Sequence, residues 1–496
     1  MHKAARERRA MRGPVRTGAA AESDAVVVGG GPNGLAAAIV LARAGRSVRL
    51  LEARDTLGGG CRSAELTLPG VIHDVCSAVH PLARSSPLFR ELNLDHHGLD
   101  WIDPPIQLAH PLDDGSAALV HRDIGETMAS FADDHDARTY RAWIEPLVHD
   151  WELIVSSLLG PIRPVAMARH PFALARFGLP ALAPAATLAR RFRSPAARAL
   201  VAGAGAHSFL PLSAPMTGGL GMALLVSAHA VGWPIPRGGS QRITDALASV
   251  LRQLGGQIET DVPVQDLGAL PPYRAALLDL TPRQILSVAG DKFGGIYAAQ
   301  LRRYRYGPAA FKLDLVLDGP IPWRDPTIGS AGTVHLGGRL EEVTASEDAV
   351  ARGRVHERPF VLLSQPSAFD ATRAPAGQHA VWAYCHVPNA WDGDASEAIL
   401  RQVERFAPGV RDRIIGQAVL NPSSLETYNA NYVGGDINGG LQHWAQFFTR
   451  PAVRWDPYST PDRGIFICSS STPPGGGVHG LCGLHAARSA LRGVLR

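Results

Sequence analysis

The segment from Ala25 to Glu52 constrains the fold of this chain more than any other segment. It reads AVVVGGGPNGLAAAIVLARAGRSVRLLE, in which two apolar runs flank three glycines and an Ala-rich stretch, and an acid ends the second run. The β-branched residues of the first run are typical of a parallel strand that is covered on both faces. We therefore expect a strand at 25–28, a helix at 35–44 and a second strand at 47–51.

The three glycines fit the spacing G-x-G-x-x-G, which is typical of a dinucleotide-binding turn. Gly29 permits the tight turn, Gly31 lets the backbone approach a pyrophosphate, and Gly34 allows close packing of helix on strand. The helix N-terminus then favours the diphosphate, because its free N–H groups and dipole attract an anion. Glu52 falls where a carboxylate accepts hydrogen bonds from ribose hydroxyls. The segment therefore predicts a dinucleotide site.

A second glycine turn favours FAD over NAD as the dinucleotide. The stretch EARDTLGGGCRSAE follows directly and resembles the R-x-x-x-G-G-x-x-x-T pattern of FAD-containing oxidoreductases, whose second turn approaches the ribityl and phosphate atoms. Cys61 in this turn raises the alternative of covalent flavin attachment. We expect FAD to be bound non-covalently.

The C-terminal segment has the same organisation as the N-terminal one. RGIFICSSSTPPGGGVHGLCGLHAARSALRGVLR predicts a strand at 464–468, a Ser/Pro/Gly loop and a helix from about Gly480. Loops of this kind near both ends of the chain suggest one ligand long enough to reach both, and FAD is such a ligand. A third segment, 236–286, predicts a helix at 243–254, a strand at 257–264 and a strand from 275 that ends at Pro282.

These three segments, in this order and spacing, resemble the phytoene dehydrogenase-like flavoproteins of the amine-oxidase and phytoene-desaturase group. The sequence STPPGGGVHGLCGLHAA is similar to the "pyridine nucleotide-disulfide oxidoreductase domain 2" branch of that group. The resemblance implies an α/β fold in which a discontinuous Rossmann-like FAD-binding domain (24–100, 236–300 and 460–496) carries an α+β substrate domain (101–235 and 301–459). Residues 1–23 are expected to be a basic, disordered tail.

The predicted FAD-binding residues come from all three segments. They are Gly29, Gly31, Pro32, Asn33, Gly34, Glu52, Ala53, Arg54, Gly59, Gly60, Cys61, Arg62, Val264, Ser470, Gly476, Gly477 and Val478.

Two histidines are candidates for polar groups near the flavin, because the isoalloxazine carries the redox chemistry and the protein supplies position and electrostatics. His80 belongs to HDVCSAVH and His479 to HGLCGLH. Both stretches also have spacings that metal ligands use. Because each lies within a segment assigned to FAD, we expect no metal site, and purely structural roles remain open for both histidines.

The segments between the FAD-binding pieces are expected to form the substrate domain. The stretch FKLDLVLDG predicts a strand with Phe311 and Leu313 on one face and Lys312 and Asp314 on the other. A further strand is expected at 379–388. Residues 171–193 combine apolar residues, arginines and prolines, and indicate either helices that cap a hydrophobic cavity or a patch that rests on a bilayer.

Charge and composition exclude some classes of protein. The net charge of +4 comes from the basic stretch 1–17, so the body is not a basic nucleic-acid binder. That stretch suggests a disordered leader, an organelle-targeting segment or a contact with anionic lipid. No window is long and apolar enough for a membrane-spanning helix. Five cysteines without a CxxC pair favour a reducing compartment, so we expect a cytoplasmic protein with a membrane contact as an alternative.

The predicted function is FAD-dependent dehydrogenation of a small hydrophobic organic substrate, most simply C–C desaturation with hydride transfer to flavin N5. A redox-neutral isomerase is a variant of it. One alternative is a flavin amine oxidase, for which Lys312 is the main candidate for the lysine that such enzymes place near N5. Another is a non-enzymatic escort or regulatory protein of the same fold. The oligomeric state is left open.

Overall fold

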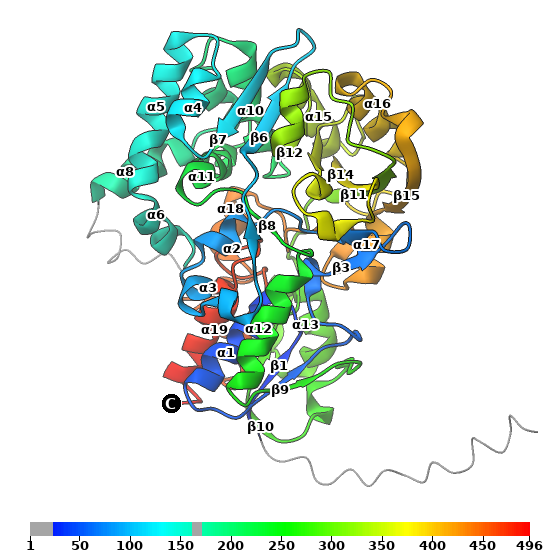
Figure 1. The fold of residues 1–496 in the computed structure, drawn as a ribbon. Coiled ribbons are helices and arrows are strands. Elements are labelled where there is room, and N and C mark those ends of the chain that lie inside the picture. Colours follow the sequence, from blue (N-terminus) through cyan, green and yellow to red (C-terminus); the bar gives the residue numbers. More distant parts are fainter. Residues whose placement is uncertain (1–22, 161–170) are drawn as a thin grey trace, which may run out of the picture.

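The computed structural model of the chain describes residues 23–160 and 171–496. Figure 1 shows two stacked parts, a parallel sheet with its helices below and a larger sheet with its helices above. The predicted basic tail, 1–23, lies outside the described residues except for Ser23, which begins the first strand.

The lower part is built on a five-stranded sheet in the order β16-β10-β1-β2-β9. Every neighbouring pair in it is parallel. The strands are β1 (Ser23–Val28), β2 (Val48–Leu51), β9 (Gln257–Glu259), β10 (Tyr273–Leu278) and β16 (Ile465–Ile467). They come from the three segments assigned to the FAD-binding domain, although the exact domain boundaries stay a prediction.

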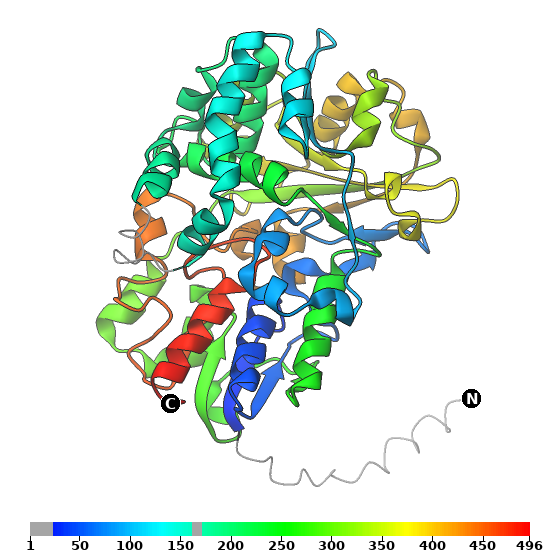
Figure 2. The ribbon, with the colours of Figure 1, turned by 60° about the vertical axis from the view of Figure 1, so that its left-hand side comes forward.

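Helices cover both faces of this sheet, which explains why its strands are almost continuously apolar. One face carries α1 (Pro32–Arg43), α12 (Gln241–Gln253) and α19 (Leu481–Arg492). The other carries α13 (Pro282–Ala289) and α14 (Gly295–Arg302). Figure 2 shows α19, in red, beside α1, in blue, so the two ends of the chain pack together.

The upper part is built on a seven-stranded sheet in the order β15-β11-β14-β13-β12-β6-β7. Its pairs are antiparallel apart from β12 and β6. The strands are β6 (Ile106–Pro111), β7 (Ala117–His121), β11 (Ala309–Leu317), β12 (Ala331–Leu336), β13 (Val361–Ser364), β14 (His379–Val387) and β15 (Ile414–Leu420).

This second sheet is also buried on both faces. One face packs on α5 (Asp134–His149), α10 (Pro195–Ala206), α11 (Thr217–Ala230) and α15 (Leu340–Ala351). The opposite face packs on α16 (Ser396–Phe406). The fold is therefore mixed α/β with a Rossmann-like domain, as predicted.

Smaller elements complete the fold. They are the strand pairs β3 (Ser63–Glu65) with β4 (Ile72–Asp74) and β5 (Trp101–Ile102) with β8 (Ile235–Pro236), and the helices α2 (Pro81–Ser85), α3 (Pro87–Glu91), α4 (Ile124–Ala129), α6 (Trp151–Leu158), α8 (Pro171–Ala181), α9 (Ala185–Ala189), α17 (Pro422–Tyr428) and α18 (Trp444–Thr449).

Two local predictions differ from the structure. The strand expected to end at Pro282 already ends at Leu278, and Pro282 begins α13, because proline at the first helical position loses no hydrogen bond. The strand expected at 257–264 is limited to β9, since only three residues pair with β2. In β11 both faces are buried, so Lys312 and Asp314 lie inside the molecule rather than in water.

Among the described residues, no helix combines the length and the apolar character needed to cross a bilayer.

Candidate functional site

The glycine turn after β1 places the N-terminus of α1 at the carboxyl edge of the parallel sheet. Gly29 has φ of +106°, which side-chain-bearing residues rarely adopt. A Cβ on Gly34 would lie 1.9 Å from the carbonyl oxygen of Gly29, so only glycine allows the helix to start this close to the strand. No residue of the first turn of α1 is acidic, and the helix dipole at this end favours an anion.

Glu52 is fixed at the end of β2 by three donors. Its Oε2 accepts from Gly30 N at 2.7 Å, and its Oε1 accepts from Arg54 N at 3.0 Å and from Arg62 Nη2 at 3.1 Å. The side chain is 7% exposed and lies in the wall of a cavity. These contacts hold the carboxylate in one orientation, as a group that reads ribose hydroxyls requires.

The second glycine turn lies against the first. A Cβ on Gly59 would be 3.1 Å from the Cα of Gly31, so the two turns approach each other closely at this point. Tyr428 donates its hydroxyl to Gly59 O at 2.8 Å, and the guanidinium of Arg62 stacks over the Tyr428 ring at 5.4 Å. A tyrosine from α17 therefore supports a turn that lies far away in the sequence.

The C-terminal loop meets the N-terminal one directly. Asn33 donates through Nδ2 to Ser470 Oγ at 3.4 Å. A Cβ on Gly483 of α19 would lie 1.9 Å from the Asn33 carbonyl oxygen, so α19 crosses α1 in backbone contact. The Asn33 Oδ1 atom is buried without a hydrogen-bond partner. The two ends of the chain thus form one wall that still has an unused acceptor.

A cavity of about 690 Å³ runs from these loops to one face of the seven-stranded sheet. That volume is within the range of roughly 300–1,000 Å³ usual for small-molecule and cofactor sites. The predicted residues that line it are Gly29, Gly31, Pro32, Asn33, Glu52, Ala53, Arg54, Gly59, Gly60, Cys61, Arg62, Val264, Ser470, Gly477 and Val478. Gly34 and Gly476 lie behind the wall, in close backbone contacts with Gly29 and Asn438.

Asp279 is a member of this wall that the sequence analysis missed. It follows β10, is 8% exposed, and accepts from Gly34 N through Oδ2 at 2.9 Å. Burial raises the pKa of this carboxyl to about 7, and the charge of Glu52 adds to the effect while the Gly34 N–H opposes it. The signal was present in the sequence, because AALLD ends an apolar strand in an acid just as VRLLE does.

The far part of the cavity carries no charged side chain. This part, called the substrate end below, is lined by His207, Leu224, Trp233, Thr333, Leu362, Trp382 and Tyr384. Burial lowers the pKa of His207 to about 3, so its imidazole is neutral at physiological pH. Thr333 Oγ1 and Trp382 Nε1 are buried without hydrogen-bond partners. The substrate end is therefore apolar with a few uncharged polar groups.

His80, one of the two predicted catalytic groups, lies in the wall of the cavity. Its Nε2 is 2.7 Å from Ser240 Oγ. Because Ser240 donates its one hydroxyl proton to Ser77 O at 2.7 Å, its oxygen accepts from His80 Nε2–H. The His80 Nδ1 atom has no partner, and burial lowers the pKa of the ring to about 4. His80 is thus a neutral imidazole with a free lone pair.

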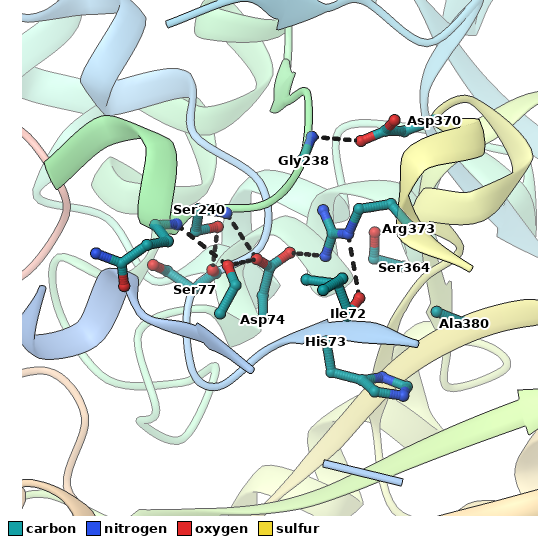
Figure 3. Close-up of polar contacts among 12 residues, drawn as sticks. Ile72, His73, Asp74, Ser77, Gly238, Ser240, Ser364, Asp370, Arg373 and Ala380 are labelled. Atoms are coloured by element: carbon teal, nitrogen blue, oxygen red, sulfur yellow. Dashed lines mark hydrogen bonds and ion pairs between the residues drawn. The ribbon is translucent and has the colours of Figure 1, made fainter. Parts of the chain in front are cut away.

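A buried ion pair fixes Ser240 (Figure 3). Asp74 accepts from Ser240 N at 2.7 Å through Oδ1 and from Arg373 Nη2 at 2.6 Å through Oδ2. Arg373 is fully buried and also donates to Ile72 O at 3.1 Å. Burial alone would raise the pKa of Asp74, but Arg373 and the Ser240 N–H outweigh it and lower the pKa. Sequence reasoning could not find this group, since its members lie far apart in the chain.

His479, the other predicted catalytic group, is buried but does not line the cavity. Its Nδ1 accepts from Leu481 N at 3.1 Å, and its carbonyl accepts from Ser86 Oγ at 2.7 Å. These contacts fix the start of α19. A catalytic role for His479 has no geometric support, and the structural alternative describes its contacts better.

Lys312 lies beside the cavity rather than in its wall. It forms a buried ion pair with Asp314, whose other oxygen is 3.3 Å from His73 Nδ1. A lysine held in this way has no free amino group to offer at the substrate end.

Neither histidine–cysteine stretch forms a metal centre of three ligands. Among the described residues, the set of three potential ligands whose atoms lie within 4.8 Å of one another is Asp133, His135 and Asp136. Asp133 there is the N-cap of α5, accepting from His135 N and Asp136 N. Burial also raises the pKa of the Cys61 thiol to about 12, so this cysteine lacks the thiolate that attacks electrophiles.

The residues present fit a dinucleotide such as FAD. The glycine turns form a cradle that a Cβ would fill, Glu52 is oriented for ribose, and Asn33 Oδ1 is an orphaned acceptor in the wall. Two nearby helices, α1 and α19, begin at this edge of the sheet. The fold and the site thus define a dinucleotide-binding protein of the flavin-dependent oxidoreductase class.

Comparisons with known proteins agree with this class. Residues 27–92 match the family described as "NAD(P)-binding Rossmann-like domain". The chain is 25% identical to "Pyridine nucleotide-disulfide oxidoreductase domain-containing protein 2" of Rattus norvegicus, over 95% of this chain and 94% of that protein. It is 33% identical to "Hydroxyneurosporene desaturase" of Cereibacter sphaeroides over 48% of this chain and 49% of that protein. The chain is therefore a homologue of both proteins.

Solved structures show the same fold. Putrescine oxidase bound to putrescine superposes with a TM-score of 0.60 at 18% identity, over 96% of this chain and 100% of that one. Cyclohexylamine oxidase from Brevibacterium oxydans gives a TM-score of 0.53 at 13% identity, over 96% and 98%. At these identities the likeness concerns the fold alone.

Proposed function

We propose that this protein is an FAD-dependent oxidoreductase that dehydrogenates an uncharged, mainly apolar organic substrate. The observation that carries this proposal is the composition of the cavity wall. Its charged members, Glu52, Arg54, Arg62 and Asp279, all belong to the loops at the edge of the parallel sheet, and the substrate end has none. An apolar substrate gains free energy from burial there, whereas an ion would lose its hydration without compensation.

Bound FAD would supply the hydride acceptor. The residues of this chain would supply position and exclude water. Leu224, Trp233 and Leu362 would hold the apolar body of the substrate, and Thr333 Oγ1 and Trp382 Nε1 would gain partners from an uncharged oxygen on it. His80 Nδ1, neutral and unpartnered, would be available to accept a hydrogen bond.

The amine-oxidase alternative has less support. The amine oxidases named above share the fold, but the substrate end has no carboxylate that could pair with the ammonium group of an amine substrate. Lys312 is already paired with Asp314. The escort alternative predicts a protein that binds FAD weakly or not at all and has no substrate to oxidise.

The test is an anaerobic titration of the FAD-loaded protein with a panel of uncharged apolar compounds and matched amines. The visible absorbance of the flavin should be bleached by an uncharged compound and not by its amine analogue. Bleaching by amines alone would overturn the proposal in favour of the amine-oxidase alternative. A loaded protein that no compound bleaches would overturn the proposed dehydrogenation, and a protein that takes up no FAD would favour the escort alternative.

We further propose that the protein is cytoplasmic and contacts a bilayer through α8. All five cysteines are free, as in a reducing compartment. Phe172 and Leu179 of α8 are 85% and 72% exposed, and the neighbouring Leu182 is also exposed. Large apolar side chains grouped on a surface are typical of membrane or protein contacts. Co-sedimentation with anionic vesicles should fall in an F172S/L179S variant, and unchanged sedimentation would contradict the contact.

A further inference from the structure

One acidic side chain, Asp279, lies against the glycine turn that the diphosphate of a dinucleotide is expected to approach. Asp279 Oδ2 accepts a hydrogen bond at 2.9 Å from the backbone N–H of Gly34, the third glycine of the motif. Cβ atoms built on Gly31 and Gly34 would lie 2.9 and 3.2 Å from this same oxygen. A Cβ built on Gly29 would lie 3.0 Å from the Cβ of Asp279, so all three glycines of the motif lie next to this side chain.

A carboxylate at this place competes with the ligand that the turn is built to take. The N-terminus of α1 stabilises one anion through its dipole and free N–H groups. A second anion nearby is repelled, and the low dielectric of a buried site makes the repulsion stronger than in water. A protonated carboxyl is neutral and therefore does not repel the diphosphate. It can also donate a hydrogen bond to a phosphate oxygen.

The carboxyl already binds its proton unusually tightly before any ligand arrives. Burial is the main cause that raises its pKa to about 7. A diphosphate would raise this pKa further, because a nearby like charge disfavours the ionised form.

Glu52 and Arg62 form an ion pair at 3.1 Å beside the turn. The histidines and cysteines around the turn stay uncharged near neutral pH. Burial lowers the pKa of both His80 and His479 to about 4. It raises the pKa of Cys61 to about 12, that of Cys482 to about 11, and that of Cys468 well above its ordinary value.

We propose that Asp279 is a proton-binding group of the cofactor site, so that the dinucleotide and one proton bind to this turn together. The inference rests on the proposed function, because it requires FAD to bind here. Affinity is then independent of pH while Asp279 is protonated in the free protein. At pH values above the pKa of Asp279 in the free protein, each further pH unit weakens FAD binding by up to about tenfold, because a proton must be taken up with the ligand.

The experiment measures FAD affinity as a function of pH with the full chain freed of bound flavin. Quenching of flavin fluorescence gives Kd between about pH 6 and 9, a range in which ordinary carboxyls stay ionised. The wild-type Kd should be flat below about pH 7 and should rise above it, approaching tenfold per unit. D279N should show a Kd that does not change with pH, because its amide keeps the size of the carboxyl and does not titrate.

Two measurements keep the proposal falsifiable even if D279N folds poorly. D245N, a matched control on an exposed position of α12, should keep the wild-type pH dependence. Calorimetry of the wild type in two buffers of different ionisation enthalpy should show uptake of a proton that approaches one per FAD above about pH 7. A wild-type Kd without pH dependence and without proton uptake would overturn the inference. A chain that binds no FAD at any pH would instead overturn the proposed function.

Discussion

The crossing of α1 and α19 makes a direct prediction about the substitution Gly483→Ala. In this structure a Cβ at position 483 would lie 1.9 Å from the Asn33 carbonyl oxygen and 2.8 Å from Ala37 N. Both are backbone atoms, so no side-chain rotation relieves the clash. The helices must separate, and the start of α1 in the cavity wall must move with them.

Two opposing effects set the size of the loss. Alanine in a helix interior is favoured over glycine by about 1 kcal/mol. Overpacking of a well-packed contact typically costs roughly 1–3 kcal/mol. Because the clash is with backbone and is severe, we expect the upper end of that cost, and a net loss of about 2 kcal/mol in the free energy of unfolding. We also expect FAD affinity to fall by about tenfold, which corresponds to about 1.4 kcal/mol.

The assay compares urea unfolding and FAD binding of G483A with those of G290A. Gly290 lies at the end of α13 with φ of −51°, and a Cβ there would meet nothing within 4 Å. G290A should therefore match the wild type or exceed it slightly. The reasoning is refuted if G483A is as stable as G290A and binds FAD equally well, because the two ends of the chain would then not pack as described.

Three further predictions follow from individual contacts. E52Q leaves Arg62 without its ion pair and weakens the ribose contact, so the Kd for FAD should rise by roughly 10- to 100-fold, as for hydrogen bonds to charged groups; an unchanged Kd would contradict the role of Glu52. R373M leaves Asp74 buried and unpaired and should cost roughly 3–5 kcal/mol in urea unfolding, and D74N/R373M should recover part of this loss. Asp279 binds its proton more tightly in the folded chain than in the unfolded one. The flavin-free protein should therefore lose thermal stability as pH rises from about 4 to about 7, and D279N should lose less over the same range. Equal losses would contradict the raised pKa.

The N-terminal half of the site could be predicted from the sequence because its signals are local. The glycine turn, Glu52 and the second turn lie within one short stretch, and each residue type has a distinct physical reason. The C-terminal loop was recognisable for the same reason. The sequence also predicted where α1 and β2 begin and end to within a few residues.

The rest of the site depends on contacts that no local pattern reveals. Arg373 meets Asp74 only because the chain folds back over 299 residues, and Ser240 meets His80 across 160. His479 was placed at the flavin edge from its position in a glycine loop, whereas its ring packs behind the wall. The alternation in β11 placed Lys312 and Asp314 on one face, but it could not show that layers cover both faces of this strand.

The central claim is that loops from opposite ends of the chain form one site for one FAD. The measurement that tests it most directly is the flavin content of the purified, full-length protein, before and after incubation with FAD. The account predicts saturation at about one non-covalently bound FAD per chain, released on denaturation. A well-folded protein that is colourless and takes up no added FAD would contradict it.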